Sequence, residues 1–211
     1  MITVACVLRS GGVYTPEWVQ RLAAGVDRHL PLPYRFVGLS DVLVSNVECV
    51  KLSPSAGPGW WSKLSLFEPG VLRGRVLFLD LDSVIVGDLS DLASYASAFG
   101  MLSDYYRPQL AQSGIMAWDA DGPIPGEIWA RWITDPGVNM SRCWGDGVLI
   151  AEVLAGREDR LERLYPGQLP SWKVDCRGVV PPGARVVVFH GSPKPDHLCP
   201  SHPVAVAWRR A

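Results

Sequence analysis

The sequence predicts a single α/β domain, built on a mostly parallel central sheet with helices on both faces. Short apolar runs rich in Val, Ile and Leu alternate with segments of helical periodicity, which is the pattern of parallel strands joined by crossover helices. The 211 residues fit one domain, and no internal repeat, low-complexity tract or linker divides them. We therefore expect residues 1–211 to form one folding unit.

The first third of the chain predicts three strands and two helices. A β-branched run followed by a glycine turn predicts a buried first strand. Thr15, Pro16 and Glu17 then supply a capping hydroxyl, a proline for the first helical position and an acid for the first turn of a helix. The predicted strands are Ile2–Leu8, Tyr34–Leu39 and Val47–Leu52, and a second helix, Trp60–Phe67, follows the loop Ser53–Gly59.

The remaining two thirds continue this alternation. The apolar run that begins at Val76 predicts a central strand, and two acids, Asp80 and Asp82, interrupt it. Further strands are expected at Ala98–Leu102, Ser113–Trp118 and Arg185–Phe189, with helices near Gly126–Ile133 and Asp146–Leu154. The α/β prediction depends on this order of elements.

Composition narrows the range of partners and compartments. A formal net charge of −1 gives no global basic field, so nucleic acid is not the default partner. The five cysteines are odd in number, widely spaced and without a Cys-x-x-Cys pair, which favours a reducing compartment. The first residues lack the features of a signal peptide, and no segment approaches about 20 apolar residues, so we expect a cytoplasmic protein without a membrane span.

Asp80 and Asp82 stand in one of the most apolar runs of the chain, VLFLDLDSVIVG. A buried carboxylate without a partner is costly, so these acids require a cation. Because side chains alternate along a strand, the two acids are expected to share a face while Leu81 points into the core. Carboxylates so spaced can close on one hard divalent cation, Mg²⁺ or Mn²⁺, at the ligand-binding edge of the sheet. The alternative is that both acids begin a solvated turn after the strand.

A later apolar run, VVVFHGSPKP, ends in groups that suit the same site. His190 can supply a neutral third metal ligand, Gly191 permits close approach of the backbone, and Lys194 offers a fixed cation to a phosphate. Taken singly, His190 is equally consistent with a histidine bonded to a carbonyl, and Lys194 with an exposed lysine. Together with the acidic pair they predict a site for a metal and a diphosphate.

From Ile2 to about Pro195 the chain resembles the metal-dependent glycosyltransferases of the A-type fold, specifically the family-8 galactosyltransferases and glycogenin. Their Leu/Met-Asp-x-Asp strand end with its Val/Leu-rich continuation is similar to FLDLDSVIVGDL here. Their late His-Tyr/Phe-x-Gly-x-x-Lys-Pro element is similar to FHGSPKP, which is shorter. The resemblance implies a Rossmann-like single domain, with a nucleotide-binding part up to about residue 90 and a part for sugar and acceptor over about 91–211.

The resemblance also implies a role for each of several side chains. Asp80, Asp82 and His190 would hold Mn²⁺ or Mg²⁺, and Asp146, Asp104 and Lys63 would be catalytic. The nucleotide sugar would be bound by Leu8, Arg9, Tyr14, Lys63, Asp80, Leu81, Gln112, Gly191 and Lys194, with Tyr14 stacking on the base. The chain departs from the family at Gln112, where an asparagine is usual, and at Gly147, where the family has a glutamine that faces the anomeric carbon.

The reaction implied by the resemblance is transfer of a sugar from a nucleoside-diphosphate sugar, most commonly UDP-linked among the relatives, with retention of anomeric configuration. The metal ion, with Lys194, Lys63 and Arg9 near it, would stabilise the diphosphate as it leaves. Asp104 or Asp146 would orient the sugar or support positive charge at its anomeric carbon. The acceptor stays open among glycan, protein, lipid-linked sugar and nucleobase.

Several residues also have purely structural interpretations. Asp146 is expected where a helix N-cap would stand, and a lysine in a helix, such as Lys63, usually faces solvent. Most of the tryptophans are expected in the core, with one or two near the loop Gly57–Gly59 available to stack on an acceptor.

Two other functions fit parts of the sequence. The segment DLDSV also matches the Asp-x-Asp-x-Thr/Val of haloacid-dehalogenase-type phosphatases, in which Asp80 would be a nucleophile. That family starts its core with this strand, whereas some 80 residues precede it here. A non-catalytic module that binds sugar nucleotides is the third possibility, and the glycine at position 147 is the observation that favours it.

Overall fold

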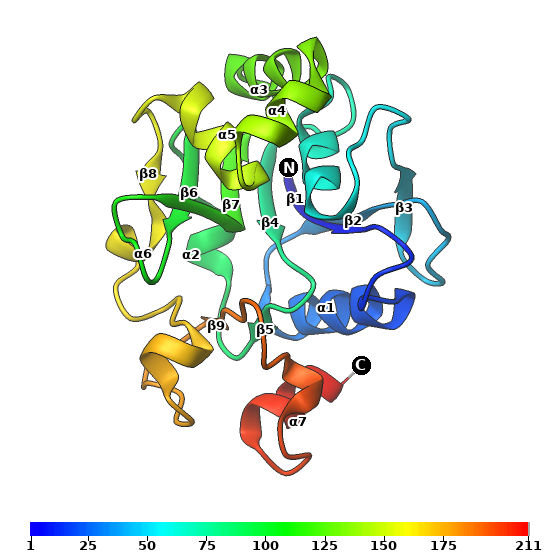
Figure 1. Ribbon diagram of the computed structural model, residues 1–211. Helices are drawn as coiled ribbons and strands as arrows, with labels where there is room; N and C mark the ends of the chain where they lie inside the picture. Colours follow the sequence, from blue (N-terminus) through cyan, green and yellow to red (C-terminus); the bar gives the residue numbers. More distant parts are fainter. Residues whose placement is uncertain (211) are drawn as a thin grey trace.

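The computed structural model describes residues 1–210, and it confirms the predicted mostly parallel sheet with helices on both faces (Figure 1). Seven strands lie in the order β3-β2-β1-β4-β7-β6-β8. Their bounds are β1 Ile2–Leu8, β2 Tyr34–Ser40, β3 Glu48–Lys51, β4 Arg75–Leu79, β6 Phe99–Ser103, β7 Ala111–Asp119 and β8 Asp159–Arg160. Within this seven-stranded sheet, as far as the structure describes it, only β7 runs antiparallel to its neighbours, β4 and β6.

Two helical layers sandwich the sheet because the strands alternate their side chains between its faces. In β1, Val4 and Cys6 belong to the core under α1 (Pro16–His29), whereas Ala5 belongs to the opposite core. That opposite core is covered by η1 (Gly59–Phe67), α3 (Pro123–Thr134) and α5 (Asp146–Leu154). The shorter helices are α2 Ser90–Ala93, α4 Pro136–Arg142, α6 Leu161–Leu164, α7 Pro203–Arg209, η2 Trp172–Cys176 and η3 Pro195–His197.

Two elements differ from the helices predicted by periodicity. The segment around Trp60–Phe67 forms the 3-10 helix η1, so its spacing indicated a helical turn but not the tighter type. The C-terminal helix α7, which was not predicted, packs on α1, where the rings of Trp18 and Trp208 lie 4.7 Å apart. Its short apolar face was too brief to give a periodic signal.

The strand predicted at Arg185–Phe189 is shorter than expected and lies outside the main sheet. Only Val186–Val187 form β9, which pairs antiparallel with β5 (Val84–Ile85) in a separate two-stranded sheet. The run Val186–Phe189 is buried, as its composition predicts. An apolar run specifies burial but not the strand that it pairs with, which explains the difference.

The geometry predicted for the acidic pair also needs correction. Strand β4 ends at Leu79, and the Ser83 amide donates to the Asp80 carbonyl at 2.9 Å, so both acids lie in the turn after the strand. Leu81 is buried as predicted. The two carboxylates therefore diverge toward different partners instead of sharing one face of an extended strand.

Among residues 1–210, no helix is both long enough and apolar enough to traverse a lipid bilayer.

Candidate active site

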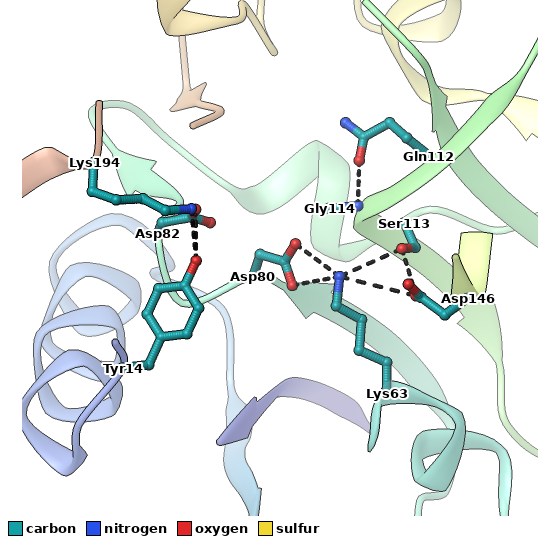
Figure 2. Close-up of polar contacts among 9 residues, drawn as sticks. All are labelled: Tyr14, Lys63, Asp80, Asp82, Gln112, Ser113, Gly114, Asp146 and Lys194. Atoms are coloured by element: carbon teal, nitrogen blue, oxygen red, sulfur yellow. Dashed lines mark hydrogen bonds and ion pairs between the residues drawn. The ribbon is translucent and has the colours of Figure 1, made fainter. Parts of the chain in front are cut away.

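Lys63 is the centre of a polar network that joins four elements (Figure 2). Its Nζ lies 2.8 and 2.9 Å from the two carboxylate oxygens of Asp80, at the end of β4, and donates to the Ser113 hydroxyl of β7 at 3.4 Å. Ser113 in turn donates to the Asp146 carboxylate at 2.6 Å, and that carboxylate is 4.0 Å from Lys63 Nζ. The predicted catalytic residues Lys63 and Asp146 are thus brought together.

The turn of η1 explains why a charged side chain is buried here. Trp61, the residue two positions earlier, packs into the core and stacks on Trp132 at 5.5 Å, which fixes the orientation of the turn. Lys63 then projects toward the sheet edge, where two acids compensate its charge. The expectation of a solvated lysine is wrong for this position, because the side chain is only 14% exposed.

Asp146 does not cap helix α5, which excludes the structural role considered for it. The N-cap is Gly145, and it makes no side-chain cap hydrogen bond. Asp146 occupies the first helical position, and its buried carboxylate points across to Ser113. At that position the carboxylate also lies at the positive end of the helix dipole, which stabilises its negative charge.

Asp82 forms a second ion pair from different elements. Its Oδ2 accepts hydrogen bonds from Lys194 Nζ and, at 2.9 Å, from the Tyr14 hydroxyl, and Tyr14 accepts from Lys194 at 2.8 Å (Figure 2). These three side chains come from the turn after β4, the residues before α1 and the loop after β9. Lys194 therefore lies at the acidic pair, as its predicted phosphate role requires.

Three carboxylates and two ammonium groups share this edge of the sheet, which leaves one surplus negative charge. Burial, reinforced by the charges of Asp82 and Asp146, raises the pKa of Asp80 to about 7, although Lys63 opposes the shift. The three acids outweigh the effect of burial on Lys63 and raise its pKa. Burial and the neighbouring Asp82 likewise raise the pKa of Tyr14, which keeps its hydroxyl protonated.

His190 is near enough to Asp82 for the charge of that carboxylate to act on its pKa, but its contacts are with other residues. Its Nε2 is 2.7 Å from the Ser171 hydroxyl, and its ring stacks on Tyr105 at 5.3 Å. Burial and the nearby Lys173 lower its pKa, which favours the neutral ring. Gly191 adopts a φ of +63°, and a Cβ there would lie 3.2 Å from Lys173 Nζ, so this position favours glycine on two grounds.

Two hollows lie at this network, and both are lined by Trp60. The first, of about 510 Å³, is lined by the glycine turn after β1 and by charged side chains from two other elements. Its lining residues are Val7, Arg9, Ser10, Gly11, Gly12, Val13, Tyr14, Gly59, Trp60, Lys63, Asp80 and Leu81. Of the predicted nucleotide-binding residues, Arg9, Tyr14, Lys63, Asp80 and Leu81 line it, whereas the Leu8 side chain is buried in the core.

The second hollow, of about 230 Å³, is lined by two residues that contact Lys63, namely Ser113 and Asp146. It is lined by Trp60, Asp104, Ala111, Gln112, Ser113, Trp144, Gly145, Asp146, Gly147 and Val148. Three predicted sugar-binding residues therefore line the same hollow: Asp104, Gln112 and Asp146. Gln112 Oε1 accepts from the Gly114 amide (Figure 2), and Asp104 Oδ1 accepts from the amides of Tyr106 and Arg107.

Sequence reasoning missed three residues of this region. Ser113 links Lys63 to Asp146, Lys173 approaches Gly191, and Trp144 lines the second hollow. For Ser113 a signal existed, because it precedes Gly114 in the segment that resembles the family's Ser/Ala-Gly motif. For Lys173 and Trp144 the local sequence gave none, since their placement depends on long-range packing.

The carboxylates at this edge suit a hard divalent cation whose remaining ligands come from substrate phosphates, and not a cation enclosed by protein ligands alone. Oxygen donors and a surplus negative charge suit Mg²⁺ or Mn²⁺, which is commonly bound by one or two carboxylates plus substrate phosphates. Within residues 1–210, however, no three His, Cys, Asp or Glu side chains are grouped as a metal site. Asp82 uses one carboxylate oxygen, Oδ2, for Lys194 and Tyr14, so its Oδ1 is open to a cation, whereas both oxygens of Asp80 contact Lys63. Metal binding by Asp80, Asp82 and His190 stays a prediction.

The fold is that of the A-type glycosyltransferases, because solved structures of glycosyltransferases are similar to this chain over 92–99% of its length. No protein-family model matches the sequence, and no curated protein matches it either. At 12–13% identity, the likeness is one of fold.

The glycosyltransferase GlyE of Streptococcus pneumoniae TIGR4 matches with a TM-score of 0.72 and 13% identity over 99% of this chain. This chain spans about three-fifths, 59%, of the GlyE chain. The galactosyltransferase LgtC, solved with donor and acceptor sugar analogs, matches with a TM-score of 0.70 and 13% identity, covering 99% of this chain and 95% of its own. The bifunctional glycosyltransferase WbbM gives 0.67 and 13% over 92% of this chain and 46% of its own.

Proposed function

We propose that the protein transfers a sugar from a nucleoside-diphosphate sugar, UDP-linked by analogy with the family, to an acceptor hydroxyl. The observation that carries this proposal is the position of Lys63, which contacts Asp80 in the first hollow and the Ser113–Asp146 pair in the second. A donor that lies across this junction would place its diphosphate beside Lys63 and its sugar beside Asp146. The similarity in fold to glycosyltransferases supports the same reading.

The first hollow suits the nucleotide and diphosphate. Gly11 and Gly12 leave main-chain amides uncovered by side chains, and Arg9 and Lys63 supply cations, so the lining offers donors to phosphate oxygens. Lys194, now paired with Asp82, is within reach of the same region through Tyr14, which lines this hollow. We therefore place the diphosphate between Lys63 and Lys194.

In the transfer step, the bond between the anomeric carbon and the diphosphate oxygen breaks, and its electron pair stays on the departing phosphate. The acceptor oxygen forms the new bond to the anomeric carbon and gives up its proton, which the departing diphosphate or solvent receives. Lys63 and Lys194 stabilise the charge that grows on the phosphate. Asp146 faces the anomeric carbon and supports the positive charge that develops there.

A divalent cation is part of this proposal, with Asp80 and Asp82 as its protein ligands and His190 as a candidate third. When bound, Mn²⁺ or Mg²⁺ supplies Lewis-acid stabilisation of the diphosphate. The lysines that now neutralise Asp80 and Asp82 would then turn to the phosphate oxygens, so each ammonium exchanges one anionic partner for another. Retention of anomeric configuration is carried over from the family resemblance.

The test is incubation with a panel of sugar nucleotides and Mn²⁺, with release of nucleoside diphosphate as the measurement. We expect slow donor hydrolysis that chelation with EDTA abolishes and that Asp146→Asn reduces. Binding of a donor without release would instead support a non-catalytic module. Hydrolysis of a generic phosphomonoester, lost in Asp80→Asn, would support the phosphatase and contradict the proposal.

A further inference from the structure

The second hollow gathers the exposed tryptophans of the described chain. Of the nine tryptophans, seven are at most 8% exposed and belong to the core. Trp60 and Trp144 are 60% and 57% exposed, and both line this hollow. An indole left in water forgoes the stabilisation that burial of its large apolar surface would give. Two such indoles on one hollow indicate a surface that is completed by a ligand.

Trp144 is exposed but firmly positioned. The Arg107 guanidinium lies over its ring at 3.8 Å from the centroid, and Arg107 is 3.6 Å from the Asp104 carboxylate. Asp104 in turn accepts from the amides of Tyr106 and Arg107 at 2.9 and 2.8 Å, which fixes the turn that carries Arg107. The guanidinium covers one face of the indole, so the opposite face is the one available to a ligand.

The polar groups of the hollow indicate the chemistry of that ligand. Its ten lining residues, as far as the structure describes them, include the carboxylates of Asp104 and Asp146 and no lysine or arginine. Gln112 uses its carbonyl on the Gly114 amide, so its NH₂ group is the part left for a ligand. Acceptors of hydrogen bonds combined with aromatic faces suit a neutral molecule that has hydroxyl groups and an apolar ring face. The cations nearest to these two carboxylates are already paired with them, Arg107 with Asp104 and Lys63 with Asp146, so the lining gives an anionic ligand no free cation.

Gly147 allows two elements that line the hollow to pack closely against each other. A Cβ at Gly147 would lie 3.3 Å from the Ser113 nitrogen and 3.4 Å from the Gln112 Cα. The absence of a side chain lets the first turn of α5 approach β7 closely. Because Asp146 lies on that turn, its carboxylate is held at the Ser113 hydroxyl in the wall of the hollow.

We propose that this hollow binds a carbohydrate acceptor, whose pyranose ring stacks on Trp144 and presents a hydroxyl beside Asp146. This inference rests on the proposed function and narrows its acceptor from four classes to one. A pyranose has C–H groups on one face, which are attracted to the negative face of an indole, and hydroxyls at its edge, which donate to carboxylates. Trp60 lines both hollows and would contact donor and acceptor, whereas Trp144 lines only the second.

The experiment compares transfer with hydrolysis in wild type, Trp144→Phe and Trp144→Leu. A neutral glycan array, a set of peptides rich in Ser, Thr and Tyr, and a set of polyprenyl phosphates serve as acceptors, with the sugar nucleotide that is hydrolysed as donor. We expect transfer to a neutral glycan, with an acceptor KM about tenfold higher in Trp144→Leu and close to wild type in Trp144→Phe. The ratio of transfer to donor hydrolysis should therefore fall about tenfold in Trp144→Leu and stay close to wild type in Trp144→Phe, because water needs no stacking platform.

Each other outcome is decisive. Equal loss of hydrolysis and transfer in Trp144→Leu would assign the indole to the donor sugar and overturn the acceptor site. Transfer only to peptides or lipids would overturn the carbohydrate class. Absence of any donor hydrolysis would refute the proposed function itself; in that case saturation-transfer NMR with methyl β-galactoside, methyl β-glucoside and cellobiose still tests the hollow. Binding lost in Trp144→Leu would support a carbohydrate site, and no binding would refute it.

Discussion

The first hollow is lined by glycines and basic side chains, whereas the second is lined by indoles and carboxylates. Both are built at one edge of one sheet, and they share Trp60. Their difference separates two tasks: the first offers cations and amides to a charged diphosphate, and the second offers apolar faces and hydrogen-bond acceptors to neutral rings. Lys63 and its partners form the boundary across which the transferred sugar would pass.

Asp82→Asn is expected to reduce the rate of the reaction more than any other change. It removes the charge of a predicted metal ligand while keeping the size of the side chain. Loss of a metal ligand that stabilises the leaving diphosphate should reduce both hydrolysis and transfer by about 10³-fold. Nucleoside-diphosphate release measures the effect. Asp91→Asn, at an exposed acid remote from both hollows, is the control. Unchanged rates in Asp82→Asn would remove the metal from the proposal.

Lys63→Met should be the most destabilising change at the boundary. It leaves Asp80 and Asp146 without their shared cation, and loss of one partner from a buried ion pair costs about 3 kcal/mol or more. The free energy of unfolding in urea measures this cost. Lys51→Met, at an exposed lysine of the edge strand β3, should leave it unchanged. Equal stability of both variants would show that Lys63 is not needed to balance the acids.

Lys194→Met should sharpen the comparison by separating metal affinity from nucleotide affinity. The Lys194 ammonium neutralises the Asp82 carboxylate, so it lowers the attraction of that carboxylate for a second cation. Without nucleotide, we expect the variant to bind Mn²⁺ about tenfold more tightly than wild type, while its affinity for nucleoside diphosphate falls. Electron paramagnetic resonance of free Mn²⁺ provides the measurement, with Lys51→Met as the matched control. An unchanged Mn²⁺ affinity would argue against this effect of Lys194 on Asp82.

The pH dependence of stability should show the smallest effect. The pKa of Asp80 in the folded chain, about 7, lies above its ordinary value of 3.8. Between about pH 4 and 7 the folded chain therefore holds a proton that the unfolded chain has already lost. Its contribution to stability therefore falls as pH rises through that window and is constant above it. The Asp80 side chain is 29% exposed, so solvent screens part of this effect. From pH 5 to pH 8, the free energy of unfolding of Asp80→Asn relative to that of wild type should rise by about 1 to 2 kcal/mol. A constant difference in urea unfolding across this range would contradict the raised pKa.

The strands and the principal helices could be predicted because their signals are local. Ile2–Leu8 and Tyr34–Leu39 are short β-branched runs, and the capping signal at Thr15–Pro16 marks the start of α1. The segment Arg185–Phe189 was correctly expected in the interior, but its pairing with β5 outside the main sheet could not be predicted, since β5 lies about 100 residues away.

The candidate site could be predicted only by residue type. Asp80, Asp82, Lys63, Asp146 and Lys194 do lie at one edge of the sheet. Their pairing was not predictable, because the turn that begins at Asp80 sends its carboxylate to one lysine and that of Asp82 to another. The roles of these residues in metal binding and catalysis stay predictions.

By itself, the sequence determined the alternation of strands and helices and the burial of its apolar runs, since each of these depends on neighbouring residues along the chain. The tertiary structure alone decided which lysine neutralises which acid and which two of nine tryptophans remain exposed. These outcomes depend on the packing of segments far apart in the sequence, because a charge or an indole is stabilised by whatever surrounds it in space and not by its neighbours in the chain.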